Sequence, residues 1–173
     1  MVETLEILGL LGYPSEIGKA LWQLEDCRRR TLRVLEDLPE AYLDHEIQGN
    51  TIGTLLYHIA LIELDWFFTE ILEEQVPDDL MRLFPDEDRD EQGALTLIKG
   101  QTLAQHLDRL VIIRKTLLEK MQGMTSEDFL RTRVLPQYEV SPAWVLHHLS
   151  QHEAEHRGEI GSVISQIKKQ SIG

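Results

Sequence analysis

The chain has 173 residues, 42% of them hydrophobic, which is long enough to bury a core and short enough for one domain, so we expect residues 1–173 to form a single globular unit. Its 30 acidic and 17 basic residues give a net charge of −13, which argues against a nucleic acid as a partner. Cys27 is the only cysteine, which excludes an intrachain disulfide, and without a basic leader or an apolar run of about 18 residues we expect a cytoplasmic protein with no membrane partner.

The first half of the chain predicts two long amphipathic helices. Apolar residues recur at helical spacing from Ser15 until Pro39 interrupts the pattern. A second helix is expected to begin near Asn50 or Thr51, because either side chain can cap a helix N-terminus, and to continue to about Glu74.

An acidic connection follows at residues 76–100, where prolines and glycines break any regular pattern. It is either a lid over a functional site or a solvated crossover, and its acidic composition favours the crossover. A third helix is predicted over residues 102–122, and residues 131–140 can be extended. The last helix is expected over residues 141–169, because the Ser-Pro at its start supplies an N-cap and a first-turn proline. This pattern indicates an all-α fold, a four-helix bundle with a long crossover between helices two and three.

Two histidines of the last predicted helix, His152 and His156, are four residues apart and therefore lie on one face. On an ideal helix His156 lies about 40° from His152, within the apolar stripe, so both rings face inward. His58 lies at the edge of the apolar stripe of the second predicted helix.

A lone inward histidine such as His58 is more often a hydrogen-bonded core residue than a metal ligand. The pair is different, because burying two neighbouring imidazoles without partners is costly, whereas one divalent ion satisfies both. The sequence therefore predicts a metal site formed by His58, His152 and His156.

Other polar residues allow more than one role. Glu153 lies in the broad apolar sector of the last predicted helix, and it is either a proton carrier or an acceptor that orients a ligand imidazole, or an interhelical salt-bridge partner. His106 lies in line with the leucines of the third predicted helix, which favours a core or rim position over contact with a substrate. His148 lies about 40° from His152 on the side away from His156 and is expected at the rim.

The run His-Glu-Ala-Glu-His also satisfies the H-E-x-x-H pattern of zinc peptidases, in which the glutamate is the general base. Ser162 stands where the extended form of that pattern needs a third histidine, and Glu159 is the last acidic residue of the chain. No strand-rich segment that could hold a peptide is apparent. These features argue against a peptidase.

The run His-Glu-Ala-Glu-His-Arg-Gly-Glu-Ile at residues 152–160, with Pro-Ala-Trp-Val-Leu-His-His-Leu at 142–149 and Thr-Leu-Leu-Tyr-His-Ile-Ala at 54–60, resembles the DinB-like superfamily of bacterial four-helix-bundle metalloproteins. The similarity in element order covers residues 15–169. The resemblance implies that the same three histidines hold zinc or nickel, with water completing the shell. It also implies a homodimer. Characterised relatives include transferases and isomerases that use low-molecular-weight thiols such as bacillithiol or mycothiol.

Two functions are compatible with such a site. Three neutral imidazoles leave an ion with open positions and its full charge, so it can lower the pKa of a bound water or thiol. The first function is therefore a divalent-metal-dependent enzyme that acts on a small molecule, with a thiol-dependent transferase-type reaction favoured over hydrolysis. The alternative is a non-catalytic metal-binding stress-response protein with a dimerising bundle, in which the ion stabilises the core.

Overall fold

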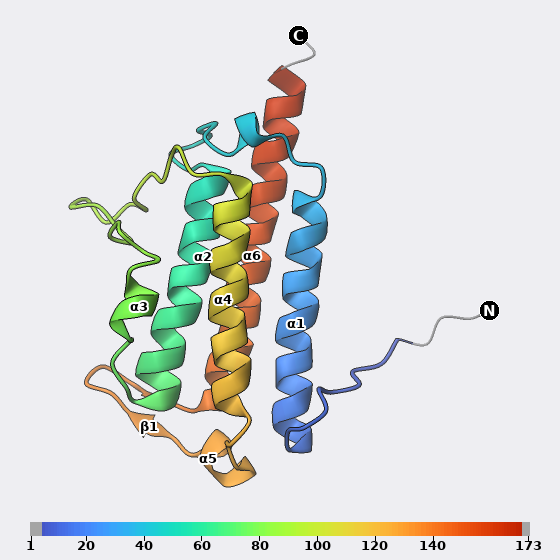
Figure 1. Cartoon of the computed structure of the whole chain (residues 1–173), viewed down its shortest axis with the longest axis vertical. Coiled ribbons are helices and arrows are strands. Elements are labelled where there is room, and N and C mark those ends of the chain that lie inside the picture. Colours follow the sequence, from blue (N-terminus) through green and yellow to red (C-terminus); the bar gives the residue numbers. More distant parts are fainter. Residues whose placement is uncertain (1–4, 171–173) are drawn as a thin grey trace.

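The computed structural model describes residues 5–170, and in this part of the chain nearly all regular structure is helical. Its four long helices lie side by side along the long axis of the molecule (Figure 1), and they are α1 (Ser15–Leu35), α2 (Ile52–Trp66), α4 (Leu103–Met121) and α6 (Pro142–Gln170). Helix α2 packs against both α4 and α6, and α1 packs against α6. The prediction of an all-α fold is confirmed.

Capping side chains mark where two of the long helices begin. The hydroxyl of Thr51 accepts a hydrogen bond from the backbone N–H of Thr54 at 2.9 Å and caps α2, as predicted. Thr102 and Gln105 form a reciprocal capping box at the start of α4. These caps satisfy backbone donors that would otherwise lack a partner in the first turn.

The two long helices of the first half end differently from the prediction. Helix α1 ends at Leu35, before Pro39 is reached, and Asp37 then adopts a left-handed φ of 58°. Helix α2 continues beyond its last residue as a π-helical segment, η2 (Phe67–Leu72), which ends where Glu73 adopts a φ of 57°. The spacing of apolar residues does not predict where these backbone changes occur, because apolar side chains continue before and after each of them.

Short elements connect the long helices. They are η1 (Glu40–Tyr42), α3 (Asp78–Met81), α5 (Ser126–Leu130), β1 (Arg133–Val134) and β2 (Glu139–Val140). The strands pair antiparallel, with Arg133 opposite Val140 and Val134 opposite Glu139. The expectation that residues 131–140 can be extended is therefore met in part, by a small hairpin.

The apolar core lies between the long helices, with α2 at its centre. Eleven of the 15 residues of α2 are buried, which is typical of a helix enclosed on most sides. The aromatic rings of Tyr57, Phe67 and Phe68 are among its largest fully buried side chains. No helix between residues 5 and 170 combines the length and the apolarity needed to cross a bilayer.

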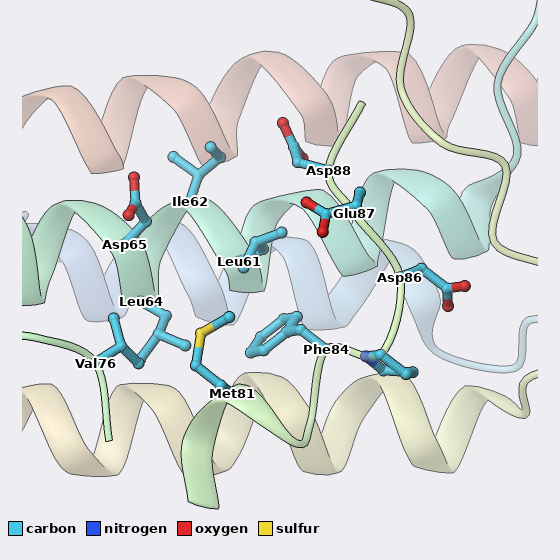
Figure 2. Close-up of a pocket in the computed structure, with 11 residues that line it drawn as sticks. Leu61, Ile62, Leu64, Asp65, Val76, Met81, Phe84, Asp86, Glu87 and Asp88 are labelled. Carbon is cyan, nitrogen blue, oxygen red and sulfur yellow. The ribbon is translucent and has the colours of Figure 1, made fainter. Parts of the chain in front are cut away.

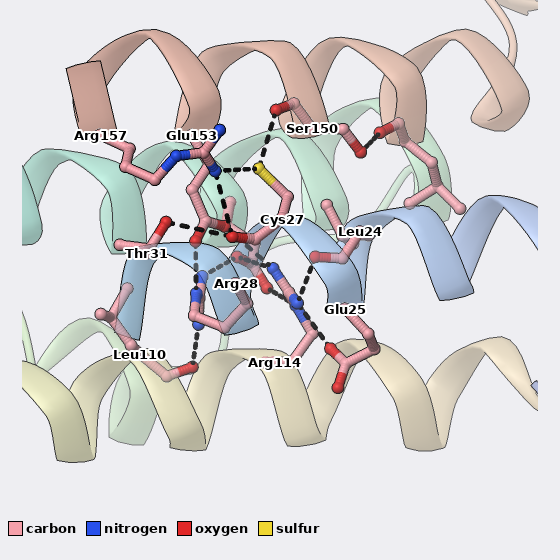
Figure 3. A network of polar contacts seen from close by, with 12 residues as sticks. Leu24, Glu25, Cys27, Arg28, Thr31, Leu110, Arg114, Ser150, Glu153 and Arg157 are labelled. Atoms are coloured by element: carbon pink, nitrogen blue, oxygen red, sulfur yellow. Dashed lines mark hydrogen bonds and ion pairs between the residues drawn. The ribbon is translucent and has the colours of Figure 1, made fainter. Parts of the chain in front are cut away.

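One charged side chain from each long helix meets the others inside this core. Arg28 of α1 donates to Glu63 of α2 at 2.7 Å and to Glu153 of α6 at 2.9 Å. Arg114 of α4 donates to both oxygens of Glu63, at 2.7 and 3.0 Å, and lies 3.4 Å from Glu153. All four side chains are more than nine-tenths buried. Figure 3 shows Arg28, Arg114 and Glu153 converging between the helices.

Each charged group of this four-helix ion network has a partner of opposite charge. Burial opposes ionisation of Glu63, but the charges of Arg114 and Arg28 and their hydrogen bonds outweigh it and lower the pKa of the carboxyl group. The guanidinium groups also donate to the backbone carbonyls of Leu110 and Leu24. Removing one partner from a buried ion pair of this kind is strongly destabilising, because it leaves an uncompensated charge in the core.

Candidate metal centre

Three histidines from two helices converge at one point. His58 lies on α2, and His152 and His156 lie one turn apart on α6. Nε2 of His152 lies 3.1 Å from Nε2 of His58 and 3.1 Å from Nε2 of His156. The three ligand atoms all lie within 4.8 Å of one another, an arrangement that could hold a metal ion. The structure thus brings together the three residues that the sequence singled out.

The separation of the ring nitrogens suits a divalent ion of zinc-like size. Two nitrogens bound at about 2.1 Å, with tetrahedral or octahedral angles at the metal, lie about 3.0–3.4 Å apart. The two 3.1 Å separations fall within that range. Two of the three nitrogen pairs therefore already have the separation expected around a shared ion.

Hydrogen bonds on the far side of two rings determine which nitrogen faces the centre. Nδ1 of His58 donates to Oδ1 of Asp88 at 2.5 Å, and Nδ1 of His156 donates to Oε2 of Glu159 at 3.2 Å. In a neutral imidazole this leaves Nε2 with a lone pair and no proton. Two such lone pairs face His152, whose ring can donate to only one of them. A cation between the rings satisfies all three nitrogens.

Burial favours the neutral form of the His152 and His156 imidazoles. Desolvation, reinforced by the neighbouring rings of His156 and His58, lowers the pKa of His152 to about 3. Desolvation also lowers the pKa of His156, although the hydrogen bond to Glu159 acts in the opposite direction. Neutral imidazole is the form that binds a metal, so no proton has to leave these rings at pH 7.

The carboxylate that contacts His58 comes from the long crossover between η2 and α4. The hydroxyl of Tyr57 donates to the backbone carbonyl of Asp86 at 2.6 Å and accepts from its N–H at 3.0 Å. Further along, the N–H of Ile98 donates to the hydroxyl of Thr54 at 2.9 Å. These bonds tie the crossover to α2 on both sides of Asp88, so the segment is more than a solvated connection.

Asp88 is a site residue that sequence reasoning missed. Burial opposes ionisation of its carboxyl group, but the hydrogen bond from His58, together with the charge of Arg89, lowers the pKa, so Asp88 is an ionised acceptor. Within the acidic run at residues 86–91, nothing in the sequence distinguishes this residue from its neighbours. The sequence offered only a general rule, that a metal-binding histidine usually donates its second N–H to a carboxylate, and this rule does not say which carboxylate.

A pocket of about 260 Å³ opens beside Asp88, between α2 and the crossover (Figure 2). Ile62 and Asp65 line it from α2, and Met81 and Phe84 line it from the crossover. Partial desolvation raises the pKa of Asp65, with the hydrogen bond from its neighbouring threonine acting against it and the charge of Asp88 adding to it. Apolar side chains and four acidic residues, Asp65, Asp86, Glu87 and Asp88, thus line a pocket that borders the histidine cluster at Asp88.

Two other histidines lie outside the cluster. His106 is buried on α4 and its Nδ1 accepts from Arg109 at 3.2 Å. His106 is 1% exposed, which identifies it as a core residue, and desolvation and the charge of Arg109 lower its pKa to about 4. The half-buried ring of His148 lies 5.1 Å from that of Trp144 and 4.3 Å from that of Trp66, consistent with the predicted rim position.

Glu153 contributes to the ion network and not to the cluster. Its two carboxylate oxygens face Arg28 and Arg114, and the residue is 1% exposed. Of the two roles considered for Glu153, the structure therefore shows the interhelical salt bridge. The base of an H-E-x-x-H peptidase has to reach the reacting water, which a carboxylate held by two guanidinium groups cannot do.

Comparison with known protein families gives a match that spans the candidate site. A model of the DinB superfamily matches residues 23–160, a range that includes His58, Asp88, His152 and His156. No curated protein sequence matches the chain. Because the family match covers most of its length, the chain belongs to the DinB superfamily.

Proposed function

We propose that the protein binds one divalent metal ion through His58, His152 and His156 and uses it to activate a small-molecule substrate. The observation that carries this proposal is the convergence of three Nε2 atoms that lack enough protons to satisfy one another. Zinc or nickel is favoured, because imidazole is a good ligand for both ions. Membership of the DinB superfamily supports the same assignment.

The protein residues have distinct tasks in this proposal. Asp88 and Glu159 hold the rings of His58 and His156 with Nε2 directed at the ion. With three neutral ligands, the bound ion supplies Lewis acidity that lowers the pKa of a water or thiol at an open position. The rings of His152 and His156 are only half-buried, which leaves a side from which a small substrate can approach.

We infer that the reacting thiol arrives with the substrate, in a thiol-dependent transferase-type reaction. Cys27 is the only thiol of the chain, and its S–H donates to the carbonyl of Ser150 while Arg157 donates to its sulfur (Figure 3). Burial, together with the charge of Glu153, raises the pKa of Cys27 despite Arg157. The thiol is therefore held in the core in its protonated form, and a low-molecular-weight thiol is the more suitable nucleophile.

We further propose that two copies of the chain pair through the face formed by α1 and α4. Leu32 of α1 and Val111 and Ile112 of α4 are apolar side chains exposed to solvent on these helices. A groove of about 460 Å³ lies between the two helices, and Leu32 and Val111 are among its lining residues. Pairing would remove this apolar surface from water.

Elemental analysis of the purified protein tests the metal assignment. Wild type is expected to carry near-stoichiometric zinc or nickel, and His58→Ala, His152→Ala and His156→Ala are each expected to lose it. His147→Ala, which changes an exposed histidine on the same helix as two of the ligands, is the matched control and should retain the ion. Full retention in His58→Ala would remove that ligand from the site.

A screen of low-molecular-weight thiols with electrophilic acceptors tests the reaction. Conjugate formation should require the ion, stop on addition of a chelator and resume when the ion is restored. If the ion binds stoichiometrically but no thiol is consumed in the screen, the alternative of a non-catalytic metal-binding protein is favoured.

A further inference from the structure

A second pocket lies next to the metal centre, where the end of α2 meets the β1–β2 hairpin and the start of α6. Its volume is about 520 Å³, and its walls include the rings of Trp66, Tyr138 and Trp144 and the side chain of Glu139. Trp144 is 50% exposed and Tyr138 is 42% exposed. Large aromatic side chains that gather in an open pocket are typical of a binding surface.

The three rings belong to one stacked series. The ring of Trp66 lies 6.2 Å from that of Tyr138, with 15° between the planes, and 5.8 Å from that of Trp144, with 27° between the planes. His148 links the series to the metal centre, since its ring stacks on Trp144 and lies 6.0 Å from the ring of His152. The electron-rich faces of such rings attract cations.

A buried carboxyl group without a cationic partner is hydrogen-bonded to Tyr138. The tyrosine hydroxyl donates to Oε1 of Glu70 at 2.8 Å, and Glu70 is 5% exposed. Its Oε2 is the one buried side-chain oxygen or nitrogen in residues 5–170 that lacks a hydrogen-bond partner. Glu63 and Glu153, by contrast, each face two guanidinium groups.

Unlike Glu63 and Glu153, Glu70 has no cationic side chain in the described part of the chain to offset the cost of its burial. Burial raises the pKa of Glu70, and the hydrogen bond from Tyr138 offsets this only in part. A buried carboxyl oxygen that makes no hydrogen bond is costly, and in native proteins such an atom calls for a partner. Glu70 also lies in the π-helical segment η2, a backbone form that is frequent at functional sites.

We propose that this aromatic pocket binds a small organic cation that carries an ammonium group, with its charge against the rings of Trp66, Tyr138 and Trp144 and balanced by Glu70 and Glu139. Rings alone would accept a neutral or a cationic group, whereas the nearby carboxyl groups favour the cation. An anion is disfavoured, because neither lysine nor arginine lines the pocket and the chain has a net charge of −13. The inference concerns a site other than the three histidines and does not require a bound metal.

The three tryptophans of the chain provide a test with an internal control. Trp66 and Trp144 line the pocket, and Trp22 does not. Their indole N–H signals can be followed by nuclear magnetic resonance of the full chain, with each signal assigned from a Trp→Phe variant. Choline should shift the signals of Trp66 and Trp144 saturably and leave that of Trp22 in place. Dimethylbutanol, the uncharged isostere of choline, should bind about tenfold more weakly.

Matched variants separate the contributions of charge and rings. Glu70→Gln keeps an acceptor for Tyr138 and removes the charge, so it should weaken choline binding about tenfold and leave dimethylbutanol binding unchanged. Trp144→Leu, at a position that is 50% exposed, should weaken binding of both compounds, and Trp22→Leu should change neither.

The titrations are repeated with a chelator, which should not alter the affinity, so loss of the metal site and failure of the pocket are distinguishable. The proposal is wrong if choline and dimethylbutanol bind equally well. It is also wrong if choline moves none of the three indole signals or moves all of them alike.

Discussion

Asp88 accepts a hydrogen bond from Nδ1 of His58 at 2.5 Å, although the two residues are 30 positions apart in the chain. The bond holds the ring with Nε2 3.1 Å from Nε2 of His152. An ionised carboxylate in this position also makes the imidazole a more basic ligand. The ligand His58 therefore depends on two elements: α2 carries the residue, and the crossover supplies the carboxylate that orients its ring.

Replacing Asp88 is expected to weaken metal binding without removing it. Asp88→Ala should lower the affinity for zinc or nickel by about 10–100-fold, because His58 loses the acceptor that fixes its tautomer and its orientation. Asp88→Asn, which retains a neutral acceptor, should lower it less. Competition with a chromophoric chelator measures both values. Glu87→Gln removes a charge at the adjacent exposed position and serves as the control. An equal loss in that variant would indicate a general effect of charge.

The histidine cluster was predictable, and its carboxylate was not, for a physical reason. On a helix, an interval of four residues determines the relative direction of two side chains, so His152 and His156 could be paired from sequence alone. His58 could be placed by its position at the edge of an apolar stripe. The contact of Asp88 depends on the path of a loop with no periodicity, and a sequence pattern contains no information on that path.

The same distinction applies to Glu153. Its place in the inward sector of α6 follows from the helical repeat, and the structure agrees. Its role depends on Arg28 and Arg114, which come from two other helices. Local spacing therefore left a role beside the metal and a salt bridge equally open, and only the packing of the helices decides between them.

Removing one member of the ion network at the centre of the core should be strongly destabilising. Glu63→Gln leaves Arg28 and Arg114 buried with too few negative partners, so it is expected to lower the free energy of unfolding by about 3–5 kcal/mol. Urea denaturation followed by circular dichroism measures this change. Glu74→Gln breaks a solvent-exposed pair with Lys120 and should cost at most about 1 kcal/mol. A comparable cost for both variants would show that the loss of Glu63 leaves no uncompensated charge in the core.

His106 should make the stability of the metal-free protein depend on pH. Burial and then the charge of Arg109 lower the pKa of His106 in the folded chain to about 4, against 6.5 for an unperturbed histidine. Between pH 6.5 and pH 4 the unfolded chain therefore binds a proton that the folded chain does not. The contribution is fully present above pH 6.5 and is lost as the pH falls toward 4.

Urea unfolding at a series of pH values, with a chelator present, measures this dependence. His106→Gln should reduce its slope below pH 6.5, because one group that titrates differently in the two states has been removed. His147→Gln changes an exposed histidine and should leave the slope as in wild type. An unchanged slope in His106→Gln would mean that the buried ring takes up its proton in the folded chain.

Because the proposed dimer pairs through the apolar face of α1 and α4, a single charge placed in that face should separate the two copies of the chain. Val111 is 60% exposed beside the groove between these helices, so Val111→Glu would place a carboxylate in the proposed interface and repel the same residue of the other copy. Multi-angle light scattering should give a dimer for wild type and a monomer for this variant. Met81→Glu, at an apolar position on α3 that is 44% exposed, should remain a dimer. If Met81→Glu dissociates and Val111→Glu does not, the copies pair through the crossover side instead.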